Sequence, residues 1–205
     1  MGKVLITQSL LSSWGYMFRC NEDNQDAAQA AFMQVLNREP IEQSDAMRSG
    51  IQFECEVYKA AAGIARQPHP KWENGIQSVS RIIKGAPVQI RVRRDIEVCG
   101  INFLLYGVLD AMQAGTIYDV KFVSASFCKV DLAGKYLDSP QHPAYLYMVP
   151  EAVNFEYLVS DGSDLYKETY DRASTRPISD IIAEFVHSLE ALNLLEIYKE
   201  KWLAK

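Results

Sequence analysis

Two short segments combine two acids and a lysine in a spacing that suggests a hairpin. Residues 107–110 end in Asp110, and residues 117–121 contain Asp119 and Lys121, with a hinge at residues 113–115 between them. If both segments are strands, side chains alternate between faces, so Asp119 and Lys121 share one face. The apolar side chains on the other face are Tyr118, Val120 and Phe122. The hinge then places Asp110 beside Asp119.

Adjacent carboxylates favour a bound cation, because two like charges at close range repel. Oxygen-only ligands favour a hard divalent ion, Mg²⁺ or Mn²⁺, over zinc, and no cluster of cysteine and histidine competes for this assignment. We therefore expect a metal site with Lys121 at its rim. The alternative is an ordinary exposed ion pair on an edge strand, which stabilises a protein only weakly.

Length and composition are typical of one α/β domain over residues 1–205. No apolar run is long enough to span a membrane, and residues 4–6 are too short for the core of a signal peptide, so we expect a soluble cytoplasmic protein. The net charge of −5 argues against a protein that coats nucleic acid through bulk electrostatics. It is compatible with an enzyme that binds a phosphodiester locally.

The densest basic stretch has two readings. It contains Arg91, Arg93 and Arg94, with Arg81 and Lys84 just upstream. A solvated strand face accounts for it at least as well as a track for phosphates does, and both readings stay open.

A third acid is placed by helical periodicity within residues 44–65. Spacings of three and four place Glu54 on a mostly apolar stripe, whereas Glu56 falls on a polar one. The stripe contains Met47, Ile51, Glu54, Tyr58 and Ala61. Burying a carboxylate is costly unless something pairs with it, so an inward Glu54 needs a metal ion, an arginine or a buried water.

The remaining elements follow from periodicity and turn signals. Helices are expected over residues 7–19, from the polar break at 21–25 to about 37, and around Gln141 and Tyr145, which share a helix face four residues apart. A meander of antiparallel strands is expected from 88 to 123, and a hairpin over 154–170. One C-terminal helix, residues 177–203, is expected to pack on the sheet, with a dimer contact as the alternative.

This order of motifs resembles the PD-(D/E)XK nuclease superfamily, and within it the RecB-like exonuclease group, which includes CRISPR-associated and phage recombination nucleases. The resemblance covers residues 7–150. It implies an α/β restriction-endonuclease-like core, a mixed β-sheet flanked by helices.

The resemblance also implies roles for individual residues. Glu54, Asp110 and Asp119 would bind Mg²⁺ or Mn²⁺, and the main-chain carbonyl of Val120 would add a ligand. Lys121 would be the catalytic lysine. Gln141 and Tyr145 would form the helix motif beside the active site.

The activity implied is metal-dependent hydrolysis of DNA, by an exonuclease of recombination, repair or phage DNA processing. A homo-oligomer or a recombination partner protein is compatible with this reading. The alternative is an inactive nuclease-fold protein that binds DNA or acts as a scaffold. Exo- or endonuclease action, polarity, and DNA or RNA as substrate stay open.

Some relatives hold an iron–sulfur cluster through one cysteine before the core and three near the C-terminus. Cys20 could mimic the first, but nothing after Cys128 supplies the others. We therefore expect no iron–sulfur cluster, and we expect four buried, reduced thiols.

Overall fold

The computed structural model describes residues 2–127 and 132–204. Its helices are α1 (Gln8–Arg19), α2 (Gln25–Leu36), α3 (Asp45–Ala61), α4 (Glu73–Ile82), α5 (Gln141–Met148), α6 (Ile178–Ala191) and α7 (Leu195–Lys201), and the short 3-10 helix η1 (Glu22–Asn24) precedes α2. Its strands are β1 (Val4–Thr7), β2 (Val88–Val98), β3 (Ile101–Gln113), β4 (Thr116–Phe122), β5 (Asn154–Ser160) and β6 (Leu165–Asp171). None of the described helices has the length and apolar character needed to cross a membrane.

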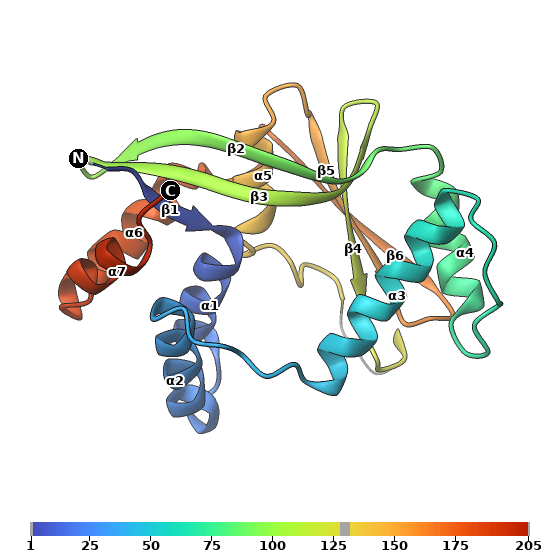
Figure 1. Ribbon diagram of the computed structural model, residues 1–205, viewed down its shortest axis with the longest axis horizontal. Coiled ribbons are helices and arrows are strands. Elements are labelled where there is room, and N and C mark those ends of the chain that lie inside the picture. The colour runs from blue at the N-terminus through green and yellow to red at the C-terminus, as the bar shows by residue number, and fades with distance from the viewer. Residues whose placement is uncertain (1, 128–131, 205) are drawn as a thin grey trace.

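The strands form one mixed sheet flanked by helices, as predicted. Its order is β1-β3-β4-β5-β6, with β2 on the remaining edge of β3. The pairs β2–β3, β3–β4 and β5–β6 are antiparallel, which confirms the predicted meander and hairpin, and β1–β3 and β4–β5 are parallel. In Figure 1, β2 and β3 run lengthwise along the top while β4, β5 and β6 cross them steeply.

One edge of β3 is only partly paired. β2 follows the other edge almost throughout, and β1 pairs with residues 103–106 and β4 with residues 111–113. Residues 107–110 therefore have no strand beside them on the edge that β1 and β4 share. We call this interval the edge gap.

A tight turn joins β3 to β4. Its two residues, Ala114 and Gly115, have φ angles of 50° and 77°, the left-handed values that a two-residue hairpin turn requires. This turn sets the register, which pairs Met112 with Ile117. The predicted hinge is confirmed.

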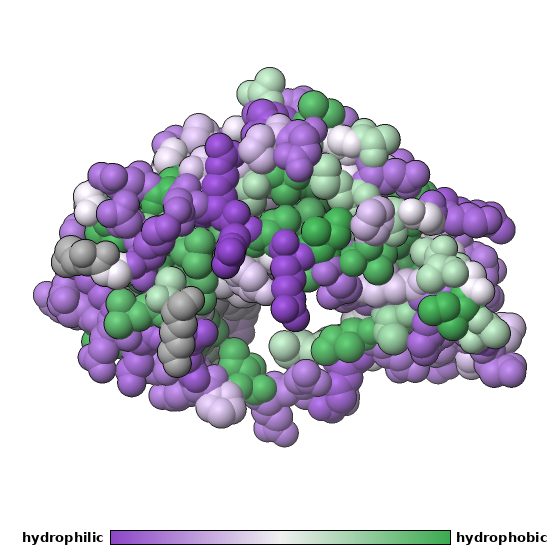
Figure 2. All heavy atoms as spheres, turned by 45° about the horizontal axis from the view of Figure 1, so that its top comes forward, coloured by the Kyte–Doolittle hydropathy of each residue, from purple (hydrophilic) through white to green (hydrophobic). Residues whose placement is uncertain are grey.

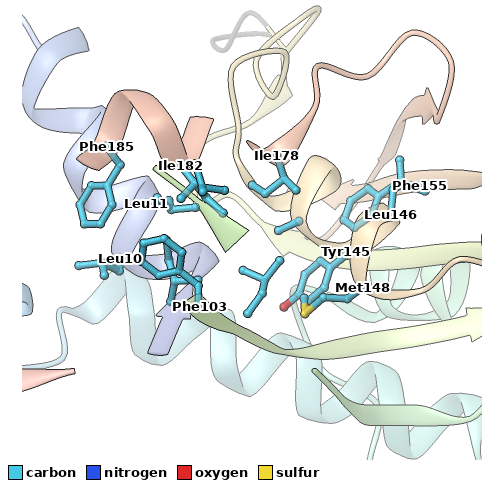
Figure 3. Close-up of a cluster of buried hydrophobic side chains, with 14 of the residues drawn as sticks. Leu10, Leu11, Phe103, Tyr145, Leu146, Met148, Phe155, Ile178, Ile182 and Phe185 are labelled. Carbon is cyan, nitrogen blue, oxygen red and sulfur yellow. The ribbon is translucent and has the colours of Figure 1, made fainter. Parts of the chain in front are cut away.

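Both faces of the sheet carry an apolar core. The larger cluster joins one face to α1, α5, α6 and α7, and Figure 3 shows Phe103 of β3, Tyr145 of α5 and Phe185 of α6 within it. The smaller cluster joins the other face to α3 and α4 through Phe53, Val57, Ile76, Val79 and Val120. The burial of these side chains from water is the main force that holds the helices against the sheet.

Two predictions about helices were wrong in part. The C-terminal helix expected over 177–203 is two helices, because the chain turns after α6 where Asn193 has a φ of 57°, a left-handed value that commonly ends a helix. In α3 the buried stripe is Phe53, Val57 and Ala61, whereas Met47 and Ile51 are exposed. Glu54 lies at the border of that stripe, half-buried, and not in its middle.

Two further details differ from expectation. β1 was not predicted, because four residues carry too little periodicity to reveal a strand. Cys55 and Cys99 are free but exposed, and Cys20 is half-buried, because they lie on an outer helix face, in a turn and at a helix end. Cys128 lies outside the described residues.

Candidate functional site

The candidate site begins at the edge gap, with Asp110. The β3–β4 ladder ends at the pair Ala111–Tyr118, and one further step in this register would pair Asp110 with Asp119. Instead, the Asp110 side chain crosses toward β4, and its Oδ2 accepts a hydrogen bond of 2.8 Å from the Val120 main-chain N–H. A carboxylate thus occupies the place of a backbone partner.

Asp119, on β4, is buried between a lysine and a glutamine. It is 4% exposed, although its face was expected to be the charged one. The amide of Gln141, the first residue of α5, donates a hydrogen bond to Oδ1. Lys121 Nζ lies 2.7 Å from Oδ2 as an ion pair. The helix covers this carboxylate and leaves the lysine partly exposed.

The pKa values of these groups reflect their burial and the closeness of several carboxylates. Burial raises the pKa of Asp110 well above its usual range, and the charges of Asp119 and Glu54 raise it further. Burial also raises the pKa of Asp119, although Lys121 and Gln141 oppose this effect. Burial alone would lower the pKa of Lys121, but Asp119 and Asp110 outweigh it and hold that pKa above its ordinary value. The site is one in which a further cation would be stabilised.

Glu54 reaches the site from α3 and is held by two donors. Tyr58 Oη donates to its Oε1 at 2.6 Å, and Gln89 Nε2 donates to the same oxygen at 3.1 Å and to Tyr58 Oη at 3.0 Å. Burial and then the charge of Asp110 raise the pKa of Tyr58, so it remains a hydroxyl donor. These contacts tie α3 to β2 beside Asp110.

Glu56, the acid that helical phase set aside, faces a different environment. Its carboxylate pairs with Lys59 at 2.7 Å and with Arg66 at 3.8 Å. The structure therefore brings Glu54, not Glu56, toward Asp110.

Tyr145, on α5, packs against β3 at the edge gap. Its hydroxyl donates to the main-chain oxygen of Val108 at 2.8 Å, so it satisfies a carbonyl within the unpaired interval. A Cβ on Gly107 would lie only 2.4 Å from Tyr145 Cε1. The glycine is therefore what allows the ring to approach the strand, and the ring positions α5 with its Gln141.

The donor set fits a hard divalent cation. In Glu54 and Asp110 one oxygen accepts every hydrogen bond from described residues and the second accepts none. Asp119 Oδ2 is buried and lies within hydrogen-bond distance of the Lys121 ammonium, at 2.7 Å. No three His, Cys, Asp or Glu side chains within 2–127 and 132–204 are already arranged around one point, so a bound cation would require these carboxylates to move toward one another.

Three residues near the site escaped the sequence analysis. Gln89 was counted as an ordinary strand residue, and nothing in the sequence indicates its left-handed φ of 55°. Tyr58 was noted only for its stripe, although its position four residues after Glu54 could have indicated the pair. Tyr136 stacks on Tyr157 at 4.2 Å. Its pKa is raised to about 12, first by burial, with Lys121 lowering and Asp119 raising it.

Comparisons with known proteins bear on the fold. No protein-family model and no curated protein matches the sequence. The crystal structure of SSO0001 aligns over 94% of this chain and 78% of its own, with a TM-score of 0.54 and 13% identity. An alkaline exonuclease (LHK-Exo) from Laribacter hongkongensis aligns over 96% of this chain and 92% of its own, with a TM-score of 0.53 and 14% identity. At such identities the likeness shows the fold alone, an α/β arrangement with a mixed sheet flanked by helices that this chain shares with both proteins.

Proposed function

We propose that the protein is a Mg²⁺- or Mn²⁺-dependent deoxyribonuclease that hydrolyses phosphodiester bonds, and that it acts as an exonuclease in recombination, repair or phage DNA processing. The observation that carries the proposal is the proximity of Glu54, Asp110, Asp119 and Lys121 at the edge gap, where burial and the charges of Asp119 and Glu54 raise the pKa of Asp110 and Lys121 pairs with Asp119. The fold shared with an alkaline exonuclease supports it.

The metal ligands proposed are the carboxylates of Asp110 and Asp119, with Glu54 completing the site and the carbonyl of Val120 as a further ligand. Magnesium keeps several of its waters, so a few protein ligands suffice. A bound divalent ion would lower the pKa of a water and neutralise the phosphoryl oxygens. The crowding of negative charge that raises the pKa of Asp110 would then be relieved.

Lys121 is the proposed catalytic residue. It follows Asp119 by two positions on the same strand face, and its raised pKa keeps it charged at neutral pH. A partly exposed ammonium at this place can orient the attacking water and stabilise the negative charge that develops on the phosphate. Gln141 fixes Asp119 through its hydrogen bond, and Tyr145 is a positioning residue that holds α5 to β3.

The proposal is tested with end-labelled linear DNA and closed circular DNA, each incubated with the protein in Mg²⁺ or in EDTA, beside Lys121→Ala. An exonuclease degrades the linear DNA only, needs the metal, and loses activity in the variant. Cutting of the circle would replace exonuclease with endonuclease. Metal-independent cleavage, or full activity in the variant, would refute the proposed chemistry.

A further inference from the structure

On the part of the sheet formed by β2 and β3, one face is covered by neither of the two apolar clusters. The strand register pairs Arg91 with Val108 and Arg93 with Tyr106, and the next residue on that face of β3 is Leu104. The two arginines are exposed, and the three β3 side chains are half-buried and belong to neither core cluster. Helix α3 reaches this face of β2 at Gln89, at the end beside the acids, whereas α5 and α6 contact β2 from the opposite face, where Leu105 and Leu109 are buried. We call this uncovered surface the open face.

The arginines of the open face have no partner of opposite charge. Within the described residues, neither Arg91 nor Arg93 forms an ion pair or a side-chain hydrogen bond, whereas Lys3 pairs with Asp95, the next charged residue on this face, at 2.6 Å. Arg94 points the other way and is engaged, since it donates to the Tyr147 main-chain oxygen at 2.7 Å. Two uncompensated positive charges therefore remain on a protein whose net charge is −5.

Both strands lead from these arginines directly to the candidate site. Val108, opposite Arg91, precedes Asp110 by two residues, and Gln89, which holds Glu54, precedes Arg91 by two. Alternate residues of a strand are about 6.8 Å apart, so the acids, Arg91 and Arg93 follow one another at steps of that order. An extended polynucleotide strand repeats its phosphates over a similar distance. Figure 2, which brings β2 and β3 forward, shows apolar side chains exposed among strongly hydrophilic ones.

We propose that the open face binds one strand of DNA, with successive phosphates on Arg91 and Arg93 and bases against Tyr106, and so leads that strand to the acids. The assignment of substrate rests on the proposed function. A single strand is favoured over a duplex because half-exposed aromatic and aliphatic side chains offer stacking surface, which only unpaired bases can use. The two arginines carry a charge opposite to that of the phosphates, and this charge would have no role on a strand face that only contacts water.

The test measures binding of a fluorescein-labelled single-stranded oligonucleotide to the full chain in EDTA, by anisotropy over a range of salt. Arg91→Ala/Arg93→Ala should bind roughly tenfold more weakly and reduce the slope of log K against log salt by roughly 1.4. Tyr106→Ala should weaken binding about tenfold with an unchanged slope. The matched control, Arg81→Ala/Lys84→Ala, removes two exposed positive charges on and just after α4 and should bind as the native chain does.

The outcomes separate this surface from the activity. Equal losses in the arginine pair and in the control pair, or duplex binding that depends equally on Tyr106, would overturn the open-face assignment. A native chain that cuts in Mg²⁺ while the arginine pair cuts and binds normally would refute the surface and leave the nuclease. A native chain that binds through these arginines but never cuts would refute the nuclease and keep the surface.

Discussion

The amide of Gln141 donates a hydrogen bond to Asp119 Oδ1, and this contact joins the first turn of α5 to the middle of β4. The two oxygens of the carboxylate thus have different partners: the helix holds Oδ1, and Oδ2 faces Lys121. These two contacts fix the orientation of the Asp119 carboxylate relative to Lys121.

Replacing Gln141 should shift the pH dependence of cleavage. The hydrogen bond from Gln141 lowers the pKa of Asp119, so Gln141→Leu should raise that pKa further. Because the ionised acid is the proposed ligand, the acid limb of the rate profile should move to higher pH. Gln77→Leu is the control, since Gln77 makes a similar bond of 2.8 Å to Glu73 on α4. Equal profiles for the two variants would contradict this role.

Removing the lysine should abolish turnover and leave the fold intact. We expect Lys121→Ala to lower kcat about 100-fold or more in Mg²⁺, because a preorganised charge at the reacting phosphate is lost. Asp119→Ala should be equally inactive, and circular dichroism should show a folded protein in both. Lys167→Ala is the matched control, because it breaks an ion pair of 2.8 Å with Glu156 elsewhere in the sheet. Residual activity near the native value in Lys121→Ala would exclude the mechanism.

The two acids of α3 should differ in metal binding. Glu54→Gln should weaken Mn²⁺ affinity measured by calorimetry about tenfold or more, because a charged ligand at the site is replaced by a neutral one. Glu56→Gln should bind Mn²⁺ as the native chain does, since its carboxylate pairs with Lys59 and Arg66. Equal losses in both variants would show that the effect is only one of net charge.

In the metal-free protein Asp110 and Asp119 should contribute less to stability as the pH rises from about 4, where unfolded carboxyls ionise. Burial raises the pKa of both Asp110 and Asp119, so the native state binds more protons than the unfolded state over the interval up to those raised pKa values. Their contribution is complete below that interval and lost above it. Thermal melts at several pH values test this, and Mn²⁺ should restore stability on the high-pH side. In Asp110→Asn the pH slope should be smaller, and an unchanged slope would contradict the assignment.

A methyl group at the gap should disturb the helix. Gly107→Ala places a Cβ against Tyr145, so we expect a loss of about 1–3 kcal/mol in the free energy of unfolding and a large fall in cleavage. Gly50→Ala, inside α3 with open space around it, should instead gain roughly 0.5–1 kcal/mol. Denaturant titrations of both variants provide the measurement, and equal stability of the two would exclude steric contact at Gly107.

The sequence revealed those parts of the site that follow from local periodicity. Alternation along β4 placed Asp119 with Lys121, and helical phase distinguished Glu54 from Glu56. The apolar stripe predicted for α3 was too long, since Met47 is exposed. The apolar character of a residue does not say whether another element will cover it.

The remaining features depend on distant contacts. The edge gap exists because β1, about one hundred residues before β3, stops pairing at Tyr106. The left-handed Gln89 depends on the partner strand and on α3, and no local composition marks it. Burial of Asp119 requires α5, which follows it by more than twenty residues. Such features are set by tertiary packing, which overrides local preference.

The length of the turn at Ala114 and Gly115 determines which face of the sheet carries Asp119 and Lys121. Side chains alternate with a period of two, so one inserted residue would rotate Asp119 and Lys121 onto the face of Phe53 and Val57 while the backbone could still pair. Such a protein would keep its hairpin and lose its chemistry. Among relatives of this chain, length variation at this turn should therefore be selected against as strongly as substitution of the acids.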